Sequence, residues 1–285
     1  MAADNDDNGP WFLYLGLLKV PDITVTRVQV NDTVTQIPDQ AFRNCLSLKE
    51  IKIPTSVKII GEYAFINCRS LETINLEDSS VAFILDGAFM GCEALAEIKL
   101  PTSVISICVN AFSGCSSLQS ILLPDSITSI GDGIFSGCRA LRTVELPNGI
   151  TSIPPDAFLY CSSLKRMLFP NSVTEIGSAF YNCLSLATLR LPNNSNLTID
   201  RGIFWNCNSL TTIELPRMAL AVWPRCLVQF NNAGFFARIG LSEVGRKTCM
   251  FSFLRQKAPQ LFEDRKQPAV IVHGRGRRRQ HEQEH

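Results

Sequence analysis

Histidine is almost missing from this sequence, and its absence limits the chemistry open to the chain. Only three histidines occur in 285 residues, and none precedes His273. Nucleophilic mechanisms of the Ser-His-Asp and Cys-His kinds need an imidazole as general base beside the nucleophile. Residues 1–272 therefore hold no such catalytic group, and serines such as Ser116 and Ser163 are interpreted as loop residues.

Net charge and long apolar runs are lacking as well. The 27 basic residues balance 26 acidic ones, so no overall electrostatic field favours a nucleic acid or an anionic membrane as partner. The apolar run from Trp11 to Leu18 is followed at once by Lys19, and it is far shorter than the ~20 residues that a membrane helix needs. We therefore expect no membrane span and no membrane partner.

We expect no secretory leader, because the first residues carry Asp4, Asp6 and Asp7 where a signal peptide would carry positive charge. This start predicts a cytoplasmic location, in which the eleven cysteines stay mostly reduced. A nuclear location is the alternative. Secretion is less favoured, although it would suit the glycosylation sequons at Asn31, Asn193 and Asn196.

What the sequence does contain is a repeat with a period close to 23 residues. The segment "AFRNCLSLKEIKIP", residues 41–54, returns as "AFINCRSLETINLE", "AFSGCSSLQSILLP" and "IFSGCRALRTVELP". The phenylalanines of this motif fall at 42, 65, 89, 112, 135, 158, 180 and 204, and a cysteine follows each one three residues later. Self-similarity at such a period indicates a stacked repeat architecture.

Each period carries one strand. Ile51 and Ile53 alternate with the polar Glu50 and Lys52, and Pro54 ends the run because it cannot donate to a strand ladder. The run "EYAFINC" that follows is too short for more than a turn or two of helix. One period alone has nowhere to bury its apolar side chains, so it must stack on similar neighbours in a solenoid with a parallel sheet along one side.

The period also predicts the extent of the solenoid. Counting back one period from the first complete copy places an additional strand, without the Phe and Cys, between Val25 and Val30. The total is about nine strands, which at the usual strand spacing make a wall roughly 40 Å long. We expect an N-terminal cap at 1–24, the solenoid at 25–216, a helical C-terminal cap at 217–266 and a flexible basic tail at 267–285.

The motif A-F-x-x-C-x-x-L-x-x-I-x-[IL]-P-x-S-[VI]-x-x-I-[GP] resembles the BspA-type leucine-rich repeat. The resemblance covers roughly residues 25–216, and it implies an α/β fold class: a right-handed leucine-rich-repeat solenoid, rich in strands, with short helical turns. It also implies a role in adhesion or protein recognition and no catalytic site. The departures from the motif are modest, with Glu77 in place of the proline and Leu85, Cys108 and Asp200 in place of the glycine.

The recurring cysteine has both a chemical and a structural interpretation. A zinc site needs four ligands that converge on one point, and a disulfide needs Cβ atoms about 3.5 to 4.5 Å apart that face each other. Thiols one repeat apart that point the same way satisfy neither condition. The structural interpretation is favoured: a ladder of small buried side chains beneath the phenylalanines, made by Cys45, Cys68, Cys92, Cys115, Cys138, Cys161, Cys183 and Cys207. No metal or other cofactor is expected.

Two motifs lie near the C-terminus. The last five residues, "HEQEH", match the zinc-hydrolase motif H-E-x-x-H, but that motif works on a rigid helix beside a cleft with a further ligand. The segment Arg275–Arg279 holds four arginines in five residues, which suits nucleic-acid phosphates or nuclear import, although no aromatic residue is interleaved for base stacking. A zinc hydrolase and a nucleic-acid-associated protein therefore stay as alternatives.

The favoured hypothesis is a non-enzymatic protein-binding scaffold that uses the exposed face of the sheet. Strand alternation predicts that Leu122 and Leu168 face solvent in one column, two repeats apart. Basic side chains lie close in the repeat and would form a rim around them: Arg142, Lys165, Arg166 and Arg190. An apolar centre within a charged rim is typical of an interface hot spot, and this rim predicts a protein partner with an acidic surface.

Overall fold

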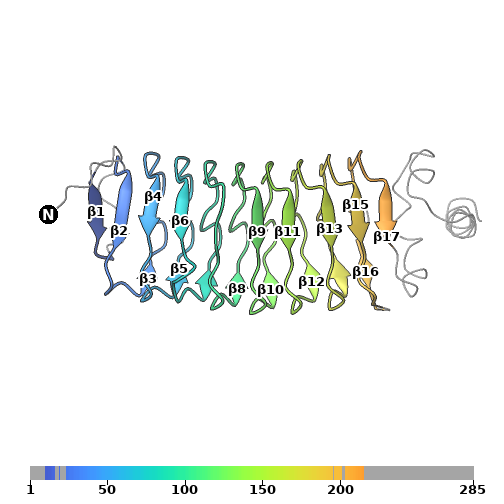
Figure 1. Ribbon diagram of the computed structural model, residues 1–285, viewed down its shortest axis with the longest axis horizontal. Coiled ribbons are helices and arrows are strands. Elements are labelled where there is room, and N and C mark those ends of the chain that lie inside the picture. Colours follow the sequence, from blue (N-terminus) through green and yellow to red (C-terminus); the bar gives the residue numbers. More distant parts are fainter. Residues whose placement is uncertain (1–9, 17–18, 20–23, 195, 201–202, 215–285) are drawn as a thin grey trace, which may run out of the picture.

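The chain forms a straight row of stacked turns, in which each turn lies beside the next (Figure 1). The computed structural model describes residues 10–16, 19, 24–194, 196–200 and 203–214. The predicted helical C-terminal cap at 217–266 and basic tail at 267–285 lie outside the described residues. Each turn with its longer strand is called a rung below.

Two rows of parallel strands run along the stack. The longer strands are β1 (Trp11–Tyr14), β2 (Arg27–Val30), β4 (Glu50–Lys52), β6 (Thr73–Asn75), β9 (Ser120–Leu122), β11 (Thr143–Glu145), β13 (Arg166–Leu168), β15 (Thr188–Arg190) and β17 (Thr212–Glu214). The two-residue strands are β3 (Gln36–Ile37), β5 (Ile59–Ile60), β7 (Phe83–Ile84), β8 (Ser106–Ile107), β10 (Ser129–Ile130), β12 (Ser152–Ile153), β14 (Glu175–Ile176) and β16 (Thr198–Ile199).

The longer strands confirm the predicted parallel-strand solenoid. Strands β2, β4 and β6 pair in the register that the repeat predicts, with Arg27 opposite Glu50 and Glu50 opposite Thr73. Residues 97–99 fill the next place through single bridges from Asn75 to Lys99 and from Glu97 to Ser120. The row of two-residue strands was not predicted from the sequence, because a polar-apolar pair such as Ser129–Ile130 is too short to show alternation.

The expected short helical turns are tight turns in the structure, and none of the described residues is helical. In the first copy, the backbone N–H of Cys45 donates to the carbonyl of Phe42, three residues back, at 3.1 Å. A helix cannot continue through this segment because Asn44 has a φ of 59°, in the left-handed region. The position before each motif cysteine shares this conformation: Asn44, Asn67, Gly91, Gly114, Gly137, Tyr160, Asn182 and Asn206.

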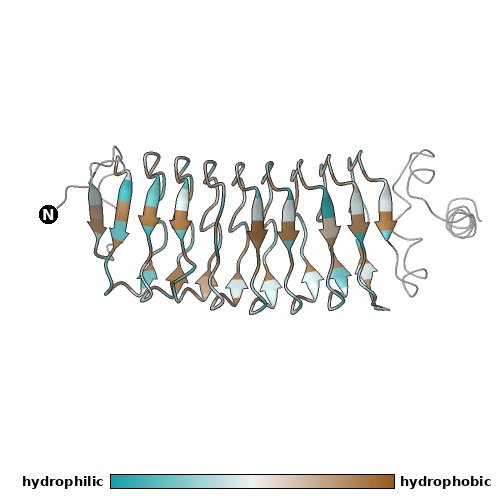
Figure 2. Cartoon of the chain, viewed as in Figure 1, coloured by the Kyte–Doolittle hydropathy of each residue, from teal (hydrophilic) through white to brown (hydrophobic). Residues whose placement is uncertain are grey.

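A stack of aromatic rings forms the centre of the core. The motif phenylalanines follow one another with ring centroids 5.0 Å apart between Phe42 and Phe65 and 6.0 Å apart between Phe180 and Phe204. Buried aliphatic residues of both strand rows belong to the same core as the rings, and polar and apolar residues alternate along strands such as β2 and β4 (Figure 2). Because each ring packs on the ring of the next rung, neighbouring rungs supply most of one another's burial.

The N-terminal end of the stack is covered by β1. This strand pairs parallel with β2, with Trp11 opposite Arg27, and so extends the row of longer strands by one. Tyr14 is buried and packs against Phe42, with ring centroids 4.9 Å apart. The tyrosine therefore takes the place of the phenylalanine that the first rung lacks.

The motif cysteines form a second ladder beside the rings. All eight are buried and none forms a disulfide, and seven of the thiols donate to the carbonyl of the phenylalanine one rung earlier. These distances are 3.0 Å from the Sγ of Cys68 to the oxygen of Phe42 and 3.1 Å from that of Cys138 to the oxygen of Phe112. The other five thiols that donate in this way are those of Cys92, Cys115, Cys161, Cys183 and Cys207.

Burial makes these thiols poor nucleophiles. It raises the pKa of Cys115 to about 12, and it raises the pKa of Cys92 well above its usual value. The thiolate is the reactive form of cysteine, so a raised pKa leaves almost none of it near neutral pH. Cys108, which stands outside the ladder, is only partly buried.

Removal of one ring from the middle of the stack should destabilise the protein strongly. Phe135 is fully buried, and its ring packs against those of Phe112 and Phe158. Phe135→Ala should lower the free energy of unfolding by about 3 to 5 kcal/mol, because burial is lost and a cavity is left. Urea unfolding measures the change, with the exposed Thr143→Ala on the same rung as control. Equal midpoints for the two variants would contradict the packing described.

The ladder thiols should resist alkylation in the native protein. At pH 8, a maleimide followed by peptide mapping should label Cys108 and leave the eight ladder cysteines unlabelled, because the ladder thiols are buried and reagent cannot reach them. In denaturant without reductant, nearly all eleven cysteines should react. Disulfide-linked ladder peptides, or ladder thiols that react as fast as Cys108, would contradict this expectation.

Candidate functional site

The outward side chains of the longer strands form a continuous surface, called the strand face below. In β6, β9, β11, β13 and β17, the middle residue is buried and the residues on both sides are exposed. Parallel pairing in register places these side chains in two columns. The first column is Arg27, Glu50, Thr73, Glu97, Ser120, Thr143, Arg166, Thr188 and Thr212, and the second is Gln29, Lys52, Asn75, Lys99, Leu122, Glu145, Leu168, Arg190 and Glu214.

Charges at the N-terminal end of this face are engaged within the chain. The guanidinium of Arg27 forms an ion pair with the carboxylate of Glu50 on the next rung, at 3.1 Å. The same guanidinium lies 4.2 Å from the ring centroid of Trp11, and the ammonium of Lys52 lies 4.1 Å from it. These two cation–π contacts with the indole of Trp11 help to hold β1 against the stack.

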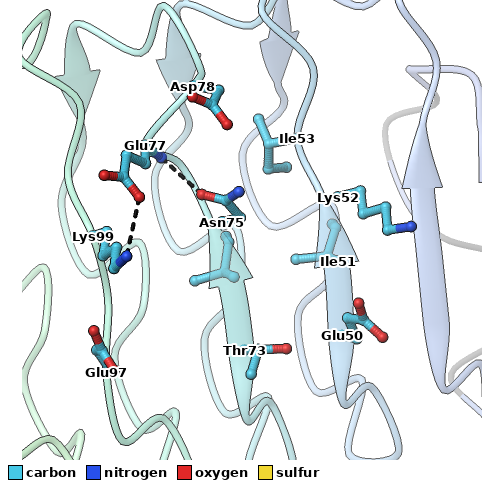
Figure 3. Close-up of a pocket in the computed structure, with 11 residues that line it drawn as sticks. Glu50, Ile51, Lys52, Ile53, Thr73, Asn75, Glu77, Asp78, Glu97 and Lys99 are labelled. Carbon is cyan, nitrogen blue, oxygen red and sulfur yellow. Dashed lines mark hydrogen bonds and ion pairs between the residues drawn. The ribbon is translucent and has the colours of Figure 1, made fainter.

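A hollow of about 570 Å³ lies on the strand face between β4 and residues 97–99. Figure 3 shows acidic side chains around it, with Glu77 at its rim between Asn75 and Lys99. The backbone N–H of Glu77 donates to the side-chain oxygen of Asn75 at 3.0 Å, and the carboxylate of Glu77 pairs with Lys99 at 3.2 Å. Among the described residues, Asp78 and Glu97 have no ion-pair partner.

A second hollow of about 730 Å³ continues the first toward β11, and Leu122 lines it. The side chain of Leu122 is 62% exposed. Carboxylates of Glu97, Asp125 and Glu145 line the same hollow, and Glu145 lies directly opposite Leu122 in the sheet register. Lys99 also lines this hollow but pairs with Glu77, so the surroundings of Leu122 carry a net negative charge.

The predicted basic side chains gather around the second leucine instead. Leu168 is 48% exposed, and Arg190 lies directly opposite it in the register. Lys165 and Arg166 precede Leu168 in the same rung, while Arg142 stands just before β11, and all three are exposed. Arg190 pairs with Glu214 at 3.8 Å, whereas Arg142, Lys165 and Arg166 have no ion-pair partner in the part of the chain that the structure describes.

The structure thus divides the patch that the sequence predicts. Leu122 and Leu168 lie in one column, two rungs apart, as expected, but Glu145 stands between them. Leu122 has an acidic surround and Leu168 a basic one. Sequence reasoning missed this division, although the order Leu122, Glu145, Leu168 in the column was available from the period.

The motifs behind the zinc-hydrolase and nucleic-acid alternatives do not lie among the described residues. His273, the segment Arg275–Arg279 and the motif "HEQEH" at 281–285 all lie outside them. Within residues 10–16, 19, 24–194, 196–200 and 203–214, no group of three or more His, Cys, Asp or Glu side chains is placed to hold a metal ion. The same residues include no helix of the length and hydrophobicity that crossing a membrane requires.

Two solved structures similar to this chain are bacterial leucine-rich repeat proteins. One from Bacteroides ovatus is 32% identical with a TM-score of 0.49, and the match covers 63% of this chain and 58% of that one. The T. pallidum leucine-rich repeat protein is 29% identical with a TM-score of 0.49, and the match covers 64% of this chain and 77% of that one. The chain therefore spans less than two thirds of the length of the Bacteroides ovatus protein. A comparison with curated proteins found no match.

The family model points to the same group. The model for the BspA-type leucine-rich repeat region matches in six copies, over residues 22–138 and 82–211. Leucine-rich repeat proteins generally serve as non-enzymatic interaction scaffolds, and the family model indicates neither a catalytic family nor a nucleic-acid-binding one. With its 23-residue period, its parallel rows of strands and this match over most of the described residues, the chain belongs to the BspA-type leucine-rich repeat family.

Proposed function

We propose that this protein is a non-enzymatic scaffold that binds another protein on its strand face. The observation that carries the proposal is the exposure of Leu122 and Leu168 on a sheet whose other outward positions are mostly polar or charged. Large apolar side chains at fixed spacing on a stiff sheet lose little conformational entropy when a partner covers them. The family membership supports a scaffold role.

The partner-binding residues in this proposal are Leu122, Leu168, Arg142, Lys165, Arg166 and Arg190. Three of the basic residues near Leu168 form no ion pair among the described residues: Arg142, Lys165 and Arg166. An acidic surface on the bound protein would therefore complement them. The charges steer the approach of the partner, and the leucines supply the buried contact. The cytoplasmic location that the sequence predicts stays a prediction.

Aspartate at both leucines should abolish capture of the partner. Leu122→Asp with Leu168→Asp places carboxylates where the partner would bury apolar surface, and exposed positions contribute little to stability. The bait is the full chain, immobilised at low density, and the captured proteins are compared by mass spectrometry between wild type and variant. The melting temperature should stay within about 2 °C of that of the wild type.

The chain offers a matched control for this experiment. Leu46 and Leu184, which follow two ladder cysteines, are 51% and 43% exposed and lie outside the strand face. Leu46→Asp with Leu184→Asp makes the same chemical change and should leave capture intact. Equal capture by wild type and the strand-face variant would move the binding site off the strand face.

A further inference from the structure

The two hollows on the strand face join into one surface, called the acidic groove below, part of which Figure 3 shows. They share Glu77, Glu97 and Lys99, and together they extend from β4 to β11. Six carboxylates of the described residues line the groove, against two ammonium groups. Lys99 pairs with Glu77, and the ammonium of Lys52 lies over the ring of Trp11. The groove therefore carries unbalanced negative charge, on the carboxylates without an ion-pair partner among the described residues: Asp78, Glu97, Asp125 and Glu145.

Leu122 lies within the acidic groove and adds an apolar contact to it. Its side chain is mostly exposed, between Glu97 of the preceding rung and Glu145 of the following one. A ligand that fits both features carries positive charge at the end of an apolar stem. Arginine is such a residue, because its methylene groups cover apolar surface while its guanidinium donates two hydrogen bonds to one carboxylate. The groove therefore fits an arginine-rich chain.

The sequence itself contains such a segment. Arg275–Arg279 holds four arginines in five residues, the densest positive charge in the chain. The four unpaired carboxylates lie one on each of four consecutive rungs, from the rung of β6 to that of β11. Three rung spacings amount to about 14 Å, and five extended residues span about 13 to 14 Å between their ends. The segment and the groove therefore agree in both the number and the extent of their charges.

The length of chain before this segment allows it to reach the groove. Four rung spacings, or about 19 Å, separate β17 from β9. The 60 residues 215–274 stand between Glu214 and Arg275. The last eight of them alone span about 27 Å when extended, so the reach suffices even if residues 215–266 stay at the end of the stack. A segment tethered in this way meets its site at an effective concentration of about 1 mM.

The surroundings of the second exposed leucine do not suit the same segment. The exposed side chains of Arg142, Lys165 and Arg166 near Leu168 form no ion pair among the described residues. Like charges therefore repel an arginine-rich chain there. The division of the strand face directs the segment to Leu122 and away from Leu168.

We infer that the acidic groove is the docking site of the chain's own segment Arg275–Arg279. In this arrangement the guanidinium groups pair with the four carboxylates, and the arginine stems cover Leu122. The docked segment occupies one of the two leucines proposed for partner binding, so a partner that contacts Leu122 must first displace it. The contact is intramolecular, and the inference does not rest on the proposed function.

Competition between a free peptide and the tethered segment tests the inference. The probe is a fluorescent peptide of residues 267–280, and its binding is followed by anisotropy at low salt. The receptor is the full chain with Arg275→Gln, Arg277→Gln, Arg278→Gln and Arg279→Gln, in which the segment has lost its charge and leaves the groove open. This receptor should bind the peptide, and 0.5 M NaCl should weaken the binding about tenfold or more. The wild type should bind the peptide about tenfold more weakly or worse, because its own segment occupies the groove.

Charge changes in the receptor locate the site. Glu97→Arg with Glu145→Arg should weaken peptide binding about tenfold or more, because the peptide then meets two cations in the groove. Glu97→Gln with Glu145→Gln is a milder change that adds no repulsion and should weaken it about threefold or more. Glu62→Arg with Glu175→Arg makes the same reversal at exposed positions off the strand face, and this matched control should bind as the receptor does. Circular dichroism melts confirm that each variant is folded.

Four results would overturn the inference. They are a receptor that does not bind the peptide, equal binding by receptor and wild type, a control reversal as damaging as the groove reversal, and a wild type that dimerises in sedimentation velocity only while its four arginines are present. The last result would assign the segment to the groove of a second copy. None of these measurements involves partner capture, so capture unaffected by the leucine changes would remove the proposed function only.

Discussion

The structure depends on one constraint, which is that a 23-residue rung cannot bury its own apolar side chains. Phe135 has rings of other rungs on both faces, and the thiol of Cys138 reaches the backbone of the rung before it for a hydrogen bond. Burial is thus shared between neighbours and not assembled around one centre. The regular spacing of everything on the surface follows from this shared core.

The interior is filled by the same kinds of apolar side chain on every rung, so the side chains that differ between rungs lie on the surface. The ladder thiols are enclosed in the core, and burial raises the pKa of thiols such as those of Cys92 and Cys115. The strand face has the opposite character, since its columns change from rung to rung while the buried residue between them stays apolar. Specificity in this protein is therefore a matter of which side chains occupy two exposed columns.

The repeat period accounts for what could be predicted from the sequence. The places of the longer strands, the inward direction of Ile51 and the column that Leu122 shares with Leu168 all follow from counting in steps of about 23. Features that do not follow the repeat period could not be predicted from the sequence. Trp11 pairs with Arg27 at a separation of only 16 residues (27 minus 11), so counting back by one repeat cannot find β1.

Two further gaps have local physical causes. The segment around Phe42 is a turn and not a helix because the left-handed conformation at Asn44 decides its path, and a hydrophobic pattern does not report φ. The charge pairing on the strand face depends on Glu77, which replaces the motif proline beside a one-residue lengthening of the repeat and reaches Lys99 on the next rung. Which carboxylates remain unpaired, and so where the face is acidic, follows only from the folded structure.

The three consecutive rungs that carry Gly91, Gly114 and Gly137 before their cysteines share the left-handed conformation at that glycine, and their phenylalanine rings stack on one another. A rung duplicated or deleted among them by recombination would meet the same ring, thiol and strand surfaces that it left. The ends of the solenoid would be untouched, and the protein would be longer or shorter by about 4.8 Å for each rung. Evolution can therefore lengthen or shorten the strand face one rung at a time while the packing of the core stays the same.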